Sequence, residues 1–123
     1  MKVLIVDDIK EYVESLKRAL RREFEVEEAF NLKEAKRKMN RNIGIALVDV
    51  RLSEDDPANR DGILFLEWIK ENYPDVKVII MSAYRDHDAA VDALNLGAAY
   101  YLKKPVNLRE LKQIMHDIMA EKK

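Results

Sequence analysis

Short apolar runs alternate with longer segments of helical spacing along the whole chain, and this alternation limits the possible folds more than any other feature. Three of the runs, residues 3–6, 45–48 and 76–81, are rich in β-branched side chains and show no regular polar alternation. Runs of this kind are typical of parallel strands that helices cover on both faces. Residues 25–29 and 98–102 are weaker strand candidates.

Five segments between and after these runs have the apolar spacing of amphipathic helices. Asn31 with Glu34 has the spacing of a capping box, and so has Asn107 with Glu110. Gly97 is suited to end a helix, because glycine tolerates the left-handed backbone found there. The expected helices lie within residues 9–20, 32–39, 63–69, 89–96 and 108–118.

The expected elements repeat the order strand then helix. This order predicts an α/β fold with a parallel sheet, right-handed crossovers and helices on both faces. For five strands we expect the flavodoxin-like, doubly wound order 2-1-3-4-5 with five helices, whose functional site lies at the carboxyl ends of the strands beside the switch point. We expect residues 1–123 to form one domain of this kind.

The composition excludes several classes of protein. The chain has 123 residues, no cysteine, and 22 Lys and Arg against 23 Asp and Glu, for a net charge of −1. The lack of cysteine excludes a disulfide scaffold, a zinc finger and a thiol enzyme, and the near-neutral charge argues against direct nucleic-acid binding. No apolar run approaches a membrane span or a signal peptide, so we expect a cytoplasmic domain without membrane contact.

Polar side chains directly follow four of the expected strands, and the carboxyl ends of parallel strands meet at one edge of a sheet. These side chains are Asp7, Asp8, Asp49, Ser82 and Lys104. Crowded carboxylates repel one another unless a cation joins them, and such hard oxygen ligands suit Mg²⁺. A carboxylate beside Mg²⁺ can act as a nucleophile and become an aspartyl phosphate. Lys104 would then neutralise charge, and Ser82 would donate a hydrogen bond to a phosphoryl oxygen.

Each of these residues also has an ordinary structural explanation. An aspartate after the first strand often caps the following helix, and Asp8 alone would be interpreted in that way. Two adjacent aspartates that face a third, Asp49, favour a metal site instead. For Tyr101, in the last expected strand, the ordinary explanation is a place in the core.

Five motifs follow one another in the order of the expected strands: VLIVDD at 3–8, ALVDV at 46–50, DG at 61–62, MSAY at 81–84 and GAAYYLKKP at 97–105. Together they resemble the receiver domain of two-component response regulators, the CheY-like family, over essentially the whole chain. The second half of the chain is similar in particular to receivers of NtrC-like transcriptional activators.

The resemblance implies that Asp49 accepts a phosphoryl group from a sensor histidine kinase or a phosphotransfer protein. It implies a Mg²⁺ site made of Asp7, Asp8, Asp49 and the backbone carbonyl of Arg51. In this family the phosphoryl group changes the face formed by the fourth helix, fifth strand and fifth helix. That face commonly binds partners or forms a homodimer.

The remaining site residues are also assigned by resemblance. Ser82 matches the family's switch hydroxyl, Tyr101 its rotating aromatic, and Lys104 with Pro105 its Lys–cis-Pro step. The domain would then be a phosphoacceptor switch rather than an enzyme in the usual sense. It would not bind nucleic acid itself, and any DNA binding would belong to an output domain outside this chain.

One loop departs from the family pattern. The family places a glycine eight residues after its phosphoacceptor, whereas Gly62 follows Asp49 by 13 positions (62 − 49). The acidic loop at 51–60 is therefore about five residues longer than the pattern. Arg51 and Tyr84 occupy positions that gate water in the family, and both are bulky, so we expect slow self-dephosphorylation.

Other functions fit the same fold less well. A haloacid dehalogenase-type phosphatase needs Asp-x-Asp, but Arg51 stands where its second carboxylate belongs. A flavin site needs a small, polar phosphate loop after the first strand, and Asp7 with Asp8 would repel phosphate there. The long loop leaves open a receiver-like interaction module that no longer takes a phosphoryl group. The sequence also leaves open whether the chain is complete or cut from a longer regulator.

Overall fold

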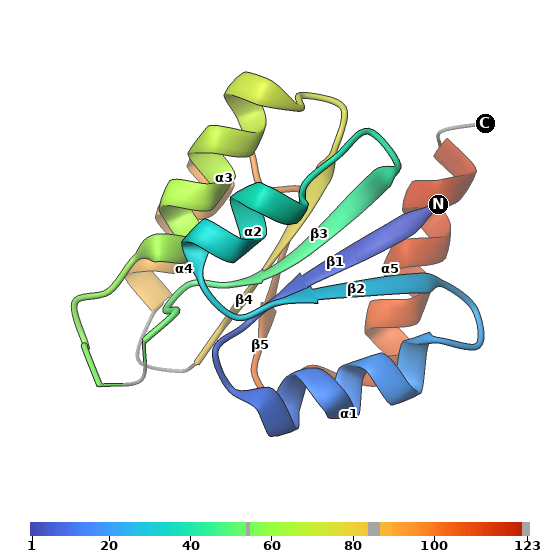
Figure 1. Ribbon diagram of the computed structural model, residues 1–123, viewed down its shortest axis with the longest axis horizontal. Coiled ribbons are helices and arrows are strands. Elements are labelled where there is room, and N and C mark those ends of the chain that lie inside the picture. Colours follow the sequence, from blue (N-terminus) through green and yellow to red (C-terminus); the bar gives the residue numbers. More distant parts are fainter. Residues whose placement is uncertain (54, 84–86, 122–123) are drawn as a thin grey trace.

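Strands and helices alternate along the chain as expected (Figure 1). The computed structural model describes residues 1–53, 55–83 and 87–121. Within these ranges the strands are β1 (Lys2–Val6), β2 (Glu25–Ala29), β3 (Ile43–Asp49), β4 (Lys77–Ser82) and β5 (Tyr100–Lys103). The helices are α1 (Lys10–Leu20), α2 (Leu32–Lys38), α3 (Asp61–Asn72), α4 (His87–Asn95) and α5 (Leu108–Glu121).

The sheet has the strand order β2-β1-β3-β4-β5, which confirms the predicted flavodoxin-like topology. Every neighbouring pair of strands is parallel. The direction of winding reverses beside β1, so the carboxyl ends of β1 and β3 lie next to each other, with Val6 opposite Val48. Residues that directly follow these two strands are therefore brought together at the switch point.

Two apolar layers hold the helices against the sheet, because alternate residues of each strand point to opposite faces. Leu4 and Val6 pack in the layer beneath α2, α3 and α4, where Phe65 of α3 is fully buried. Val3 and Ile5 pack in the layer beneath α1 and α5. Figure 1 shows this division, with α1 and α5 on one side of the sheet and the other helices opposite. Both faces of the central strands are covered, as their unbroken apolar runs predicted.

The helix starts follow the capping signals in the sequence. The Asn31 side chain accepts a hydrogen bond from the Glu34 amide at 2.8 Å. The Glu34 carboxylate accepts one from the Phe30 amide at 3.3 Å, one residue before the expected partner. At the start of α5, the Asn107 side chain accepts from the Glu110 amide at 3.0 Å. These bonds satisfy amide groups that a helix start otherwise leaves without partners.

The last strand begins two residues later than the sequence predicted. Gly97 has a φ of 105°, the left-handed conformation expected of a glycine that ends a helix. The Ala98 amide donates to the carbonyl of Ala93 at 3.0 Å, which completes a Schellman motif at the end of α4. Residue 98 therefore belongs to the helix-ending turn, the Ala99 amide donates to the carbonyl of Val78 in β4 at 2.8 Å, and the first paired residue of β5 is Tyr100.

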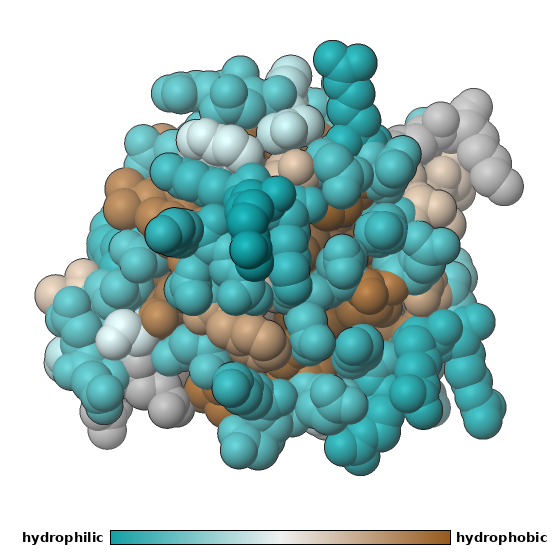
Figure 2. Space-filling model, viewed as in Figure 1, coloured by the Kyte–Doolittle hydropathy of each residue, from teal (hydrophilic) through white to brown (hydrophobic). Residues whose placement is uncertain are grey.

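Hydrophilic side chains cover most of the face of the molecule seen in Figure 2, and hydrophobic ones occupy small separate areas. This distribution agrees with the high charged fraction of the sequence, 37%. Among the described helices, none combines the length and apolarity needed to cross a bilayer.

Candidate functional site

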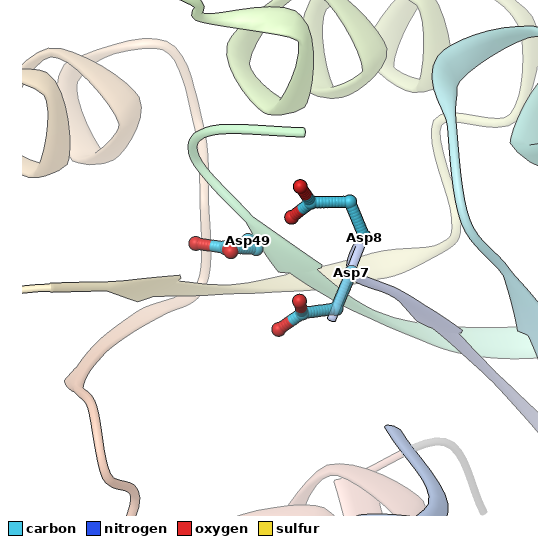
Figure 3. A group of neighbouring side chains, drawn as sticks. All are labelled: Asp7, Asp8 and Asp49. Atoms are coloured by element: carbon cyan, nitrogen blue, oxygen red, sulfur yellow. The ribbon is translucent and has the colours of Figure 1, made fainter. Parts of the chain in front are cut away.

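Three carboxylates meet at the carboxyl edge of the sheet. Asp7 and Asp8 directly follow β1, and Asp49 is the last residue of β3. Figure 3 shows their carboxyl groups pointing to the same side of the strand ends. One oxygen from each lies within 4.8 Å of the others. Asp7 is fully buried and Asp49 is 6% exposed, so the cluster is set into the protein rather than spread over its surface.

Lys104 joins two of these carboxylates. Its ammonium group donates to Oδ2 of Asp7 at 2.9 Å and to Oδ2 of Asp49 at 3.2 Å. The side chain is 13% exposed, which strengthens both ion pairs by keeping water away. The peptide bond between Lys104 and Pro105 is cis, as the resemblance implied.

Asp7 also supports the start of α1. Its Oδ1 accepts a hydrogen bond from the Ile9 amide at 2.9 Å, while its Oδ2 accepts from Lys104. The capping role that Asp8 would have alone is not what this bond shows, because Asp7 binds the amide of Ile9, the residue that precedes α1. Asp7 therefore supports the backbone before α1 and belongs to the aspartate cluster at the same time, because the two oxygens of a carboxylate accept hydrogen bonds independently.

Ser82 is a further buried polar residue at this edge of the sheet. It ends β4, is fully buried, and its hydroxyl donates to the carbonyl of Ala83 at 3.0 Å. Its own carbonyl accepts from the Lys104 amide at 2.9 Å, which ties the ends of β4 and β5 together. Within the described ranges, the buried polar or charged side chains are Asp7, Asp49 and Ser82. Burial of polar groups is costly, and here it is confined to one edge of the sheet.

The electrostatics of the cluster favour binding of a proton or cation. Burial, together with the charge of Asp7, raises the pKa of Asp49 to about 7, although Lys104 acts in the opposite direction. Burial also raises the pKa of Asp7 against the effect of the Ile9 amide and of Lys104. Burial opposes the charge on Lys104, but the two carboxylates outweigh it and raise the pKa of this ammonium. One lysine therefore does not neutralise three aspartates.

These residues fit a hard divalent cation. They offer carboxylate oxygens from three side chains at close range, with more negative than positive charge in the site. Mg²⁺ prefers oxygen ligands and usually takes a few carboxylates while it keeps water positions. The backbone carbonyl of Arg51, two residues after Asp49, remains a predicted further ligand.

The long loop after β3 returns to the site despite its extra residues. The Gly62 amide donates to the carbonyl of Val50 at 2.9 Å. A Cβ atom at position 62 would lie 1.9 Å from the carbonyl oxygen of Asp49, so this position requires glycine. The Asn59 side chain accepts from the amides of Leu52 at 2.9 Å and Asp61 at 3.0 Å, and so joins the two ends of the loop.

The loop also contacts helix α4. Arg60 forms an ion pair with Asp92 at 2.8 Å, with both side chains about half exposed. A cavity of about 200 Å³ lies between the loop and the start of α4, beside Val50. A larger hollow of about 580 Å³ lies at the amino ends of β3 and β4 and contains none of the site residues.

Of the residues with expected gating and switch roles, Arg51 and Tyr101 lie within the described ranges. Arg51 is half-buried directly beyond Val50, and Tyr101 is half-buried on β5. Tyr84 lies outside the described residues. Sequence reasoning missed Tyr12, whose ring centroid is 4.5 Å from the Lys104 ammonium nitrogen. Its place in the apolar stripe of α1 indicated only packing.

A doubly wound parallel sheet with a buried aspartate cluster and a lysine at its carboxyl edge defines a class of α/β domain suited to a metal ion and a phosphoryl group. The sequence model of one family, described as the response regulator receiver domain, matches residues 3–116. The chain belongs to this family, which confirms the resemblance drawn from its motifs. Receiver domains are phosphoacceptor signalling domains of two-component systems and bind Mg²⁺ through acidic residues.

Individual relatives agree with this assignment. The chain is 39% identical over 108 residues to the DNA-binding transcriptional regulator NtrC of Proteus hauseri, covering 88% of this chain and 22% of that protein. It is 33% identical over 116 residues to the response regulator protein PilR of Pseudomonas aeruginosa, covering 93% and 25%. The chain thus spans about a quarter of the length of these curated relatives.

Solved receiver structures share the fold. A response regulator receiver domain protein from Clostridium thermocellum superposes with a TM-score of 0.87 at 28% identity, covering 98% of this chain and 95% of that one. A CheY-like receiver domain protein from Methanospirillum hungatei has a TM-score of 0.83 at 32% identity, covering 98% and 95%. The receiver domain of NtrX from Brucella abortus has a TM-score of 0.84 at 25% identity, covering 96% and 98%.

Proposed function

We propose that this domain accepts a phosphoryl group on Asp49 from a phosphohistidine of a sensor kinase or phosphotransfer protein, in a reaction that requires Mg²⁺. The observation that carries the proposal is that, in the described part of the chain, the buried polar side chains are Asp7, Asp49 and Ser82, and Lys104 bridges the two aspartates. A protein buries three polar groups at one edge at considerable cost, and such sites are typically functional.

The proposed reaction moves one phosphoryl group and one proton. A carboxylate oxygen of Asp49 bonds to phosphorus while the P–N bond of the phosphohistidine breaks, and the leaving imidazole takes up a proton. The ammonium nitrogen of Lys104 lies 3.2 Å from Oδ2 of Asp49, so it holds positive charge beside the nucleophile and the new acyl phosphate. Mg²⁺ held by Asp7, Asp8, Asp49 and the carbonyl of Arg51 would supply the remaining charge neutralisation.

We further propose that phosphorylation changes the face formed by α4, β5 and α5. Ser82 would exchange its hydrogen bond to Ala83 for one to the phosphoryl group, and Tyr101 would repack beside it. The proposed face carries exposed apolar side chains, which support a docking or homodimer surface. These side chains are Val91, Leu94, Tyr100 and Leu108, between 37% and 45% exposed.

We also propose that the domain acts in the cytoplasm, as one unit of residues 1–123, within a longer transcriptional regulator or beside a separate partner. The name of the NtrC relative includes DNA binding, and that activity would belong to an output domain rather than to this one. The near-neutral charge of the receiver supports this division of labour. A receiver that no longer accepts a phosphoryl group is the alternative that the long loop keeps open.

Labelling by a small acyl phosphate donor tests the proposal. Wild type, Asp49→Asn and the matched control Asp55→Asn, an exposed carboxyl in the loop, are incubated with and without Mg²⁺. Intact mass spectrometry should show one added phosphoryl group in wild type and in the control only with Mg²⁺, and none in Asp49→Asn. Labelling of Asp49→Asn, or equal labelling without Mg²⁺, would contradict the proposed site. A wild type that is never labelled would favour the interaction module.

A further inference from the structure

Tyr12 reaches the site from a helix that provides none of the expected site residues. It lies in the first turn of α1, and its half-buried ring faces the Lys104 ammonium, 4.5 Å from nitrogen to ring centroid. Two hydrogen bonds of that ammonium go to Asp7 and Asp49. The aromatic ring therefore occupies another side of the same cation, where a π face attracts positive charge.

The hydroxyl of Tyr12 makes a second contact, with the segment that carries Lys104. The Val106 amide donates to the Tyr12 oxygen at 3.0 Å, across 94 positions of sequence. Val106 is two residues beyond Lys104 and directly follows Pro105, before α5 begins at Leu108. One side chain thus holds both the ammonium group and the backbone turn behind it.

We propose that Tyr12 is a positioning residue for phosphoryl transfer, which holds the Lys104 ammonium between Asp7 and Asp49 through its ring and fixes the turn at Val106 through its hydroxyl. This inference rests on the proposed function of Asp49. A lysine side chain has four rotatable bonds, so an ammonium group that serves a reaction benefits from a rigid support. Tyr12 therefore acts through Lys104 and the turn at Val106.

Substitutions at Tyr12 separate the two contacts. Tyr12→Phe keeps the ring and removes the hydroxyl, whereas Tyr12→Leu removes both. Tyr73→Leu serves as the matched control, because Tyr73 is also half-buried but packs against Trp68 at the end of α3. Urea unfolding of each variant measures how much stability the lost packing costs.

Two measurements on the unphosphorylated, metal-free protein test the contacts directly. Hydrogen exchange at the Val106 amide should become about tenfold faster in both Tyr12 variants and stay unchanged in Tyr73→Leu. Acylation of the Lys104 amine by a small amine-reactive reagent, read by peptide mass spectrometry, should become several-fold faster in Tyr12→Leu than in Tyr12→Phe. The two readouts separate the contacts, because both variants lose the hydroxyl that binds the Val106 amide and only Tyr12→Leu loses the ring that faces Lys104.

The rate of Mg²⁺-dependent labelling gives the functional result. With saturating donor, we expect a fall of about tenfold in Tyr12→Leu and of threefold or less in Tyr12→Phe, with normal labelling in Tyr73→Leu. Wild-type rates in both Tyr12 variants, or an equal loss in Tyr73→Leu, would overturn the positioning role while leaving Asp49 as phosphoacceptor. A wild type that is never labelled would overturn the proposed function and this inference together.

Discussion

Replacing Asp49 with asparagine should stabilise the metal-free protein, although it removes the proposed phosphoacceptor. Burial raises the pKa of Asp49 to about 7 from an ordinary value of 3.8. The folded state therefore binds this proton more tightly than the unfolded state, and stability is lost as the pH rises from about 4 to about 7. The difference between these two pKa values corresponds to a loss of about 4 kcal/mol in the free energy of unfolding at full ionisation.

The pKa of about 7 already includes the effect of Lys104, so the ion pair that the asparagine variant loses is not subtracted again. Lys104 keeps its bond to Asp7 at 2.9 Å, so its charge is not left alone. We expect a net stabilisation of about 2 kcal/mol above about pH 8, because the buried amide of asparagine costs about 2 kcal/mol where its N–H groups lack hydrogen-bond partners. For a chain of this length, that corresponds to a rise of roughly 8 °C in Tm.

Thermal unfolding followed by circular dichroism measures this effect. Wild type, Asp49→Asn and the exposed control Asp55→Asn are compared from about pH 5 to about pH 8, with a chelator and then with Mg²⁺. The advantage of Asp49→Asn should grow with pH in the chelator and shrink or reverse with Mg²⁺, since the metal stabilises the intact site. An Asp49→Asn variant less stable than wild type at about pH 8, or an advantage independent of pH, would refute the reasoning.

Three further substitutions test other parts of the structure. Gly62→Ala should cost about 3 kcal/mol in urea unfolding and impair labelling, because its Cβ would overlap the Asp49 carbonyl oxygen, which is backbone and cannot rotate away. Arg51→Asn should shorten the aspartyl-phosphate lifetime several-fold, measured by loss of label after donor removal; an unchanged lifetime would end the gating hypothesis. The hydrogen bond from His116 at 2.8 Å, with help from a lysine on the same helix, lowers the pKa of Glu23. The stability that this carboxylate provides is present above its ordinary pKa and is lost as the pH falls through the lowered one. Glu23→Gln should therefore lower Tm near neutral pH and leave it unchanged in strong acid. An equal loss of Tm at both pH values would contradict the stabilising role of the Glu23 carboxylate.

The order of the strands and the meeting of the aspartates could be predicted because both follow from short-range patterns. The apolar runs of β1, β3 and β4 fixed the buried strands, and the parallel topology then brings Asp7 and Asp49 to one edge. Gly97 predicted the end of α4, because glycine readily adopts the left-handed conformation that is found there. The predicted start of β5 was wrong, because residue 98 belongs to the Schellman motif that ends α4. The hydrogen bond from the Ala98 amide to the carbonyl of Ala93 cannot be recognised from the pattern of apolar residues.

What could not be predicted depends on contacts between distant parts of the chain. Tyr12 has the spacing of a core residue, and nothing near it in sequence shows that its hydroxyl reaches Val106. Asn59 resembles any polar loop residue, although it joins both ends of its loop. Asp7 and Asp8 are adjacent and chemically identical, so only the geometry of α1 shows that Asp7 binds the Ile9 amide.

The length of the loop after β3 can vary without a change in the residues proposed for phosphoryl transfer. The bonds from Leu52 to Asn59 and from Gly62 to Val50 fix the two ends of the loop, so the number of residues between Leu52 and Asn59 can differ without moving the carbonyl of Asp49. Lengthening a loop from 8 to 13 residues costs only about 0.4 kcal/mol in closure entropy. The segment is thus a natural insertion point, at which a recognition peptide or a reporter sequence could be grafted beside α4. Selection could vary the choice of partner there while the reacting groups stay the same.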